Sequence, residues 1–502
     1  MFRLLAWLIG LILGTLIMGA FLLLTETGNS FLLPSAQKIL QYRLPQAKIE
    51  LLIIRPDQAN IDLFLSNDTH ALLSAKIDII AGTAIGTWQI VSKDLTQLES
   101  ITPIPLAGAA TSEGSFDISP AQQHALGKLM LTLSQIDFKL NHAKNSALTL
   151  SAQGKLQLLE IAQLLAQPEF ATGHLQLMTS LALNDFNDKN TLNGMVVSNI
   201  TDGLLNAQIT QQKTGVELPN NIPFAANITT DVLNGKTLSQ ALLNSPLVIV
   251  NLANIRYNLG ESDILADHQT LIHELSKLNF VTRTSLKGRL QVNGTLSYNL
   301  PTNHLVVEAN SQTLGGKVTL KLNGDQLNTQ GDDLQSSAIF AMLDMPIVFK
   351  STVKAALVYD LSTQQGKFDA TLNNGQFLPN EFANALNNLA QFDITQESYE
   401  QTHTDGTINA GLIVANLDMR SRFTRISTQA ARIDFNKQHI DTTLRATLKD
   451  VTIPIHLQGR LSLPQIMPEL NSDILSKQAI DKEKYKIVDT LKQQLNFPNL
   501  NH

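Results

Sequence analysis

The stretch GKVTLKL, residues 316–322, places an apolar side chain at every second position: Val318, Leu320 and Leu322. The residues between them are threonine and lysine. Because successive side chains of a β-strand point to opposite faces, this alternation predicts a strand with one apolar and one polar face. Asn323-Gly324 follows at once, and Asn-Gly favours the positive φ of a tight hairpin. The stretch therefore predicts an antiparallel hairpin.

The same alternation recurs along most of the chain. It is clear in residues 174–183, 367–372 and 453–457, and shorter versions occur at Leu148/Leu150, Leu290/Val292 and Ile433/Phe435. Between such runs lie further dipeptides that favour turns: Gln153-Gly154, Asn193-Gly194, Asn293-Gly294, Asn374-Gly375 and Asp405-Gly406. Repetition of runs and turn signals predicts a mainly β body, arranged as an elongated, curved antiparallel sheet.

The apolar side of such a sheet has to be buried in a core or has to line a binding groove. A second sheet could bury it, as in an ordinary aliphatic core, or a strongly curved sheet could leave it lining a taco-like groove. Aromatic residues are only 5% of the chain, so the lining is mostly aliphatic and suits lipid acyl chains. The candidate lining residues are Val318, Leu320, Leu322, Phe368, Leu372, Ile433, Phe435, Ile453, Ile455 and Leu457.

Helical segments are expected to be few and short. Local spacing and flanking proline residues predict helices over residues 119–130, 158–167, 237–244, 268–278 and 380–390. A longer helix is expected over residues 471–496, near the C-terminus. No long proline- or serine-rich linker separates the β runs, so we expect one continuous β structure with helical excursions.

The N-terminus predicts a membrane anchor. The segment from Leu4 to Thr25 has 22 residues and no charge, between Arg3 and Glu26. A helix of that length spans roughly 33 Å, enough for a bilayer core of about 30 Å. Arg3 and the terminal amine place the N-terminus in the cytoplasm and the body outside it. The alternative is a cleaved signal peptide, although the apolar run is longer than is typical of one.

Composition and motifs exclude several functions. A net charge of −6 is unsuited to nucleic acid, and the absence of cysteine rules out disulfides and thiolate chemistry. No nucleophile elbow, zincin helix or phosphate loop is present, so we expect no enzyme, no metal and no cofactor. His268, His273 and Glu274 are interpreted as a solvated helix face. One weak ligand candidate remains: Arg420, Arg422 and Arg425 could contact a lipid phosphate, or could be a solvated strand edge.

The C-terminal third resembles a known family. Residues 453–468, IPIHLQGRLSLPQIMP, give a strand with a hydrophobic-Pro-hydrophobic start, a glycine turn and a Pro-x-hydrophobic end. This is similar to the closing segment of the AsmA family, and the short strand runs within residues 407–444 and 366–377 are similar to what precedes it there. The resemblance implies an inner-membrane anchor, a periplasmic taco-shaped β groove, and a role in moving phospholipid and in outer-membrane homeostasis.

Together these features predict a bitopic inner-membrane protein. Residues 1–25 are the cytoplasmic tip and membrane helix, 26–350 a periplasmic repeating β-groove region, 351–470 the AsmA-like β region, and 471–502 a C-terminal helix and tail. The groove would bind or conduct phospholipid acyl chains, with membrane lipids and an envelope protein as partners and no nucleic acid. The alternative function is a non-enzymatic envelope scaffold or chaperone that acts through strand pairing.

Overall fold

The computed structural model describes residues 26–468, except 56, 79, 99–104, 145, 186–187, 215–216, 259–261, 283–285, 391 and 449–450. The expected membrane helix over residues 4–25 and the expected helix over residues 471–496 lie outside this range. Within it, no helix is both long and apolar enough to cross a bilayer. The chain divides into two compact units, Met1–Thr270 and Leu271–His502. The boundary expected between residues 350 and 351 falls inside the second unit.

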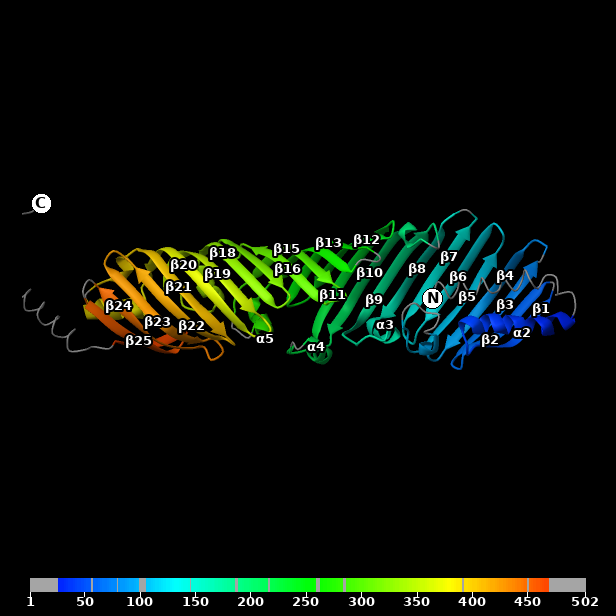
Figure 1. The fold of residues 1–502 in the computed structure, drawn as a ribbon, viewed down its shortest axis with the longest axis horizontal. Coiled ribbons are helices and arrows are strands. Elements are labelled where there is room, and N and C mark those ends of the chain that lie inside the picture. The colour runs from blue at the N-terminus through cyan, green and yellow to red at the C-terminus, as the bar shows by residue number, and fades with distance from the viewer. Residues whose placement is uncertain are drawn as a thin grey trace, which may run out of the picture. The chain divides into compact units, whose positions relative to one another are not determined.

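The first unit consists mainly of antiparallel strands that follow one another in chain order (Figure 1). From β1 to β13, each strand pairs with the next one in the sequence. Its elements are α2 (Glu26–Arg43), β1 (Lys48–Arg55), β2 (Gln58–Ser66), β3 (Thr69–Asp78), β4 (Thr83–Ser92), η1 (Leu95–Leu98), β5 (Ala110–Ile118), β6 (Gln122–Met130), β7 (Gln135–Ala143), β8 (Leu148–Gln157), α3 (Leu158–Leu164), β9 (Ala171–Leu183), η2 (Lys189–Thr191), β10 (Leu192–Leu205), α4 (Ala207–Thr214), β11 (Ile222–Leu233), β12 (Lys236–Asn244), β13 (Val248–Asn258) and β14 (Asp263–Ile272).

The second unit follows the same plan. From β15 to β26, each strand again pairs antiparallel with its successor. Its elements are η3 (Leu275–Leu278), α5 (Asn279–Thr282), β15 (Leu290–Asn299), β16 (His304–Ser311), β17 (Lys317–Asn323), β18 (Gln326–Gln335), α6 (Ser336–Met342), β19 (Phe349–Asp360), β20 (Gln365–Phe377), α7 (Glu381–Ala390), η4 (Ile394–Gln396), β21 (Tyr399–Asn409), β22 (Leu412–Arg420), β23 (Thr424–Asp434), β24 (His439–Leu448), β25 (Val451–Arg460) and β26 (Leu463–Pro468).

The prediction of a mainly β, antiparallel body is confirmed, as are two of the expected helices. Helix α3 lies within residues 158–167, and α7 within residues 380–390. The helices expected over residues 119–130 and 237–244 are wrong, because β6 and β12 occupy them. The α-helix expected over residues 268–278 is also wrong, because this segment holds the end of β14 and the short 3₁₀ helix η3. In these segments, pairing with neighbouring strands overrides a helix-like local spacing.

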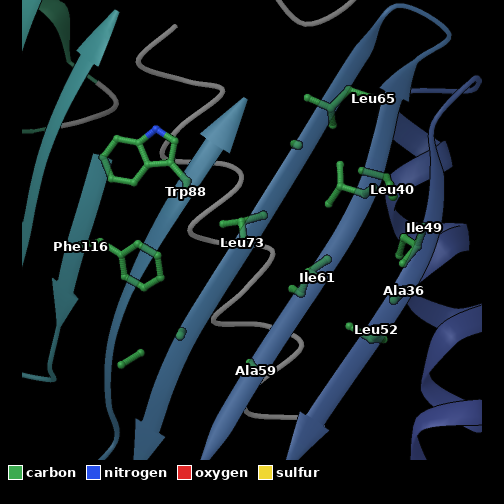
Figure 2. Close-up of a cluster of buried hydrophobic side chains, with 14 of the residues drawn as sticks. Ala36, Leu40, Ile49, Leu52, Ala59, Ile61, Leu65, Leu73, Trp88 and Phe116 are labelled. Atoms are coloured by element: carbon green, nitrogen blue, oxygen red, sulfur yellow. The ribbon is translucent and has the colours of Figure 1, made fainter. Parts of the chain in front are cut away.

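Helix α2 covers the start of the first sheet. Ala36 and Leu40 of this helix pack with Leu52 and Ile61 of the first two strands in a buried hydrophobic cluster, part of which Figure 2 shows. The side chain of Gln37 fixes the helix to the strand: its Nε2 donates to the carbonyl of Ala47 (2.6 Å), and its Oε1 accepts from the amide of Ile49 (2.7 Å). This part of the core is therefore closed by a helix held in a defined position.

Candidate functional site

One face of the first unit's sheet is apolar from strand to strand. The register aligns a single row of residues across 13 strands, and every member lies on this face. The row is Leu52, Ile61, Leu73, Trp88, Gly114, Gly127, Phe138, Ala152, Thr179, Val196, Thr230, Ser239 and Ile255. It contains no charged residue, and we call the face to which it belongs the N-terminal apolar face.

Burial along the N-terminal apolar face is uneven. Near α2, Leu63 and Ala71 are almost completely buried, and Trp88 and Phe138 are also buried. From β9 to β13, large aliphatic side chains on the same face are only partly buried. They include Leu177, Leu181, Val196, Ile228, Leu243 and Ile255. The later strands thus present aliphatic surface that no described element fully covers.

The second unit has an equivalent surface, the C-terminal apolar face, and it carries predicted groove residues from four strands. One register row runs Leu296, Val307, Leu322, Leu327, Tyr359, Gly366, Ile408, Ile413, Ile433, Ile440, Gly459 and Pro464. A parallel row joins Leu320 to Phe368 through Thr329 and Leu357. Residues far apart in the sequence therefore share one face.

The remaining candidates divide by burial. Val318 and Leu372 are partly exposed on the same face, whereas Ile453 and Ile455 are completely buried in the core next to α7. Leu457 is partly exposed, and Phe435 follows the end of β23 in a turn. The opposite face is polar near Leu320, where Lys321 Nζ pairs with Glu308 Oε1 at 2.7 Å. The alternation in residues 316–322 thus separates an apolar face from a charged one.

Several predicted turn glycines lie inside strands instead. Of the turn dipeptides, Asn323-Gly324 forms a turn, with φ +57° at Gly324. Gly375 and Gly406 lie on strands, where a Cβ would come within 2.0 Å of Phe349 and 2.7 Å of Phe368, respectively. The expectation that these dipeptides mark hairpins is wrong, because here glycine makes room for an aromatic ring.

Helix α7 and the C-terminal apolar face line a pocket of about 590 Å³ that is open to solvent on one side, and we call it the α7 chamber. Asn380 caps the helix, since its Oδ1 accepts from the amide of Ala383 at 3.0 Å. Phe382 lines the chamber from the helix, and Leu372, Met419, Ile426 and Leu457 line it from the sheet. Phe349 and Phe377 also line it, and together with Tyr399 they form an edge-to-face cluster with ring centroids 5.0–6.0 Å apart.

The chamber combines two residues predicted from the sequence with several that were missed. Leu372 and Leu457 were candidate groove residues, whereas Phe382 and Met419 were not. The sequence does indicate the helix that forms one side of the chamber. Residues 380–390 begin with an asparagine cap and have apolar residues at 382, 383 and 386. Whether this helix forms a chamber depends on which strands lie opposite it, and the sequence does not indicate those strands.

Two threonine hydroxyl groups of the chamber differ in whether they have a hydrogen-bond partner. Thr402 and Thr404 lie two residues apart on β21, and both line the chamber. Thr404 Oγ1 donates to the carbonyl of Asn416 at 2.8 Å. Thr402 is 1% exposed, and its Oγ1 has no hydrogen-bond partner among the described residues. An unpaired hydroxyl in such surroundings is costly, so Thr402 has an unused hydrogen-bonding capacity.

Two of the three arginines predicted as headgroup contacts, Arg420 and Arg425, lie on the other side of the sheet. Arg420 and Arg425 both bind Asp418, with the shortest N–O distances 2.7 and 2.8 Å, and by register all three face away from the C-terminal apolar face. Partial burial alone would raise the pKa of Asp418, but hydrogen bonds from the two arginines hold it below its usual value. Arg422 lies over the ring of Phe423. Headgroup contact stays a prediction.

The residues His268, His273 and Glu274 lie at the end of β14 and in the segment that leads into η3. Within the described residues, no three histidine or acidic side chains gather as a metal site would require. His268 is buried on β14, and its Nδ1 lies 3.3 Å from Thr270 Oγ1. Glu274 caps η3, where hydrogen bonds from the amides of Ser276 and Gly288 lower its pKa. The interpretation of this segment as a solvated helix face is therefore wrong.

Comparison with known proteins adds no relative. No family description, curated protein or solved structure matches the chain.

Proposed function

We propose that this protein binds acyl chains of membrane phospholipids on its two apolar faces. One observation carries the proposal: on the N-terminal apolar face, partly exposed aliphatic side chains continue in register from β9 to β13. Contact between aliphatic groups is favourable by about 0.8 kcal/mol for each buried CH₂ group and needs no directed polar contact. Chains could then slide along the face while their headgroups stay in water.

The expected membrane helix over residues 4–25 would locate lipid binding at the inner membrane. An inner-membrane tether, with the body in the periplasm, would bring the apolar faces to a source of phospholipid, as the resemblance to the AsmA family implies. The role would be passive conduction or storage of lipid in outer-membrane homeostasis, without catalysis. The alternative, an envelope scaffold or chaperone, would use the same faces or strand edges to bind protein.

The test is photocrosslinking of the full chain in intact cells. A benzoylphenylalanine residue replaces Leu320, on the apolar face, or Thr319, which is the preceding residue and faces the opposite side. We expect phospholipid adducts at position 320 and none at position 319. Protein adducts at 320 would favour the scaffold function, and equal labelling at both positions would contradict face-specific binding.

A charge placed on the face should block lipid. With the crosslinker at position 357, which lies in the same register row, Leu320→Lys should abolish lipid adducts and Thr319→Lys should leave them. Position 455 is unsuitable for this test, because Ile455 is completely buried and a lysine there would disrupt the core. Unchanged adducts with Leu320→Lys would refute the proposed path.

A further inference from the structure

We propose that the α7 chamber is a binding site for a single acyl chain that carries a hydroxyl group, with Thr402 as its polar contact. This rests on the proposed function, since it assumes that acyl chains reach the C-terminal apolar face. It adds a ligand class and a residue that selects it.

The shape of the site indicates one chain. The chamber has a volume of about 590 Å³, within the range of about 300–1,000 Å³ typical of small-ligand pockets. Phe382 bounds it on the helix side, and Leu372 and Met419 bound it on the sheet side. Leu463, which is 69% exposed, lies in its lining and marks where the chamber meets solvent. A flexible aliphatic chain can enter there and replace water along an almost entirely apolar wall.

The charges exclude an anionic headgroup from the interior. Among the described residues that line the chamber, the only charged one is Glu381, and it is exposed at the start of α7. A phosphate or carboxylate inside would meet no cation and would remain close to this carboxylate. Because an unpaired buried charge is very unfavourable, the chain has to enter tail first and leave its ionised end in water.

Thr402 specifies the remaining chemistry. Its neighbours in register are Leu372 and Met419, and both are apolar lining residues. A water molecule at this point would need two to four polar partners, and these neighbours supply none. A hydroxyl group on the chain would form one hydrogen bond with the Thr402 hydroxyl, either as donor or as acceptor. Thr404, on the same strand and in the same lining, already donates to Asn416, so it provides a matched control.

Calorimetric titration of the purified full chain tests this with oleic and ricinoleic acid, which differ by one mid-chain hydroxyl group. The wild type should bind ricinoleic acid about tenfold more tightly, the ratio expected of one hydrogen bond to a previously unsatisfied group. Thr402→Val should remove this preference by weakening ricinoleic acid alone. Thr404→Val should keep it. Equal binding of the two acids by the wild type, or a preference that survives Thr402→Val, would overturn the proposal.

The thermal stability of Thr402→Val and acid binding by Leu463→Trp provide two further tests of the site. Thr402→Val should raise the Tm of the ligand-free chain, because it removes an unsatisfied hydroxyl, whereas a structural role of Thr402 would lower it. Leu463→Trp should obstruct the entrance and weaken both acids equally; selective binding unchanged by this variant would place the site elsewhere. Lipid adducts at position 320 report separately on the proposed function, so they persist if only the chamber inference fails.

Discussion

Helices α2 and α7 both cover an apolar sheet face, yet one contact is filled and the other is hollow. Under α2 the sheet presents aliphatic side chains, among them Leu52 and Ile61, and Leu40 of the helix is 1% exposed. Under α7 the contact is built from rings, with Phe382 of the helix 5.9 Å from Phe377 between centroids. The α2 contact is thus packed with aliphatic side chains, whereas the contact under α7, with its aromatic rings, borders a cavity.

The largest expected effect tests the filled contact. Leu40→Ala should lower the free energy of unfolding by about 2–5 kcal/mol, because the tightly packed surroundings cannot collapse into the space left. Urea unfolding followed by fluorescence of Trp88, which lies in the same cluster, measures it. Ile39→Ala on the exposed side of α2 is the control and should change stability by about 0.5 kcal/mol or less. Similar losses for both variants would mean that α2 is loosely packed.

A second variant tests the aromatic support beside α7. Gly375→Ala would bring a Cβ within 2.0 Å of the buried Phe349 ring, so it should cost about 1–3 kcal/mol through overpacking. Circular dichroism during urea unfolding provides the measurement. Asn373→Ala, at an exposed position on the same strand, should be nearly neutral. A neutral Gly375→Ala would show that the ring is free to move.

Enlarging one residue in each region compares the contacts directly. Ala71→Leu adds volume where none is free, so it should destabilise the protein by about 1–3 kcal/mol. Leu417→Phe adds volume beside the α7 chamber and should be neutral, or stabilising by about 0.5–2 kcal/mol, as cavity-filling changes are. Differences in Tm report both effects. Destabilisation of the same size at both positions would contradict the distinction between filled and hollow contacts.

The smallest expected effect concerns alkaline pH. Burial raises the pKa of Tyr399, with the Thr424 hydroxyl acting in the opposite direction, so the folded chain keeps this proton when the unfolded chain loses it. The stabilisation is complete below the ordinary pKa of about 10 and declines above it, by at most about 1.4 kcal/mol per pH unit. Tyr399→Phe should flatten this part of the stability curve, measured by urea unfolding. An unchanged slope would mean that Tyr399 ionises freely in the folded chain.

The strand pattern could be predicted because each strand carries its own period-2 signal. Val318, Leu320 and Leu322 have their predicted alternation, and the register places them on one face with Phe368. The helix predicted over residues 237–244 is wrong although Leu238 and Leu242 have helical spacing. In the structure both are exposed on β12, whose pairing with β11 and β13 outweighs that spacing.

The candidate site could be predicted only in part. Leu372 and Leu457 were recognisable from alternation, but the α7 chamber requires knowing that α7 lies over strands that follow it in the sequence. Likewise, Gly375 and Gly406 resemble turn residues until the rings of Phe349 and Phe368 are placed beside them. Steric contacts between residues that are far apart in the sequence cannot be predicted from the local sequence pattern.

Pairing of each strand with its immediate successor also has a kinetic consequence. Within β1–β13, and again within β15–β26, no strand has to wait for a partner made much later in synthesis. Ring closures between neighbouring strands are short, so the entropic barrier at each step is small compared with that of sheets built from distant strands. A growing chain can therefore add one hairpin at a time to a sheet already formed, and each new strand finds its partner at the newest edge of that sheet.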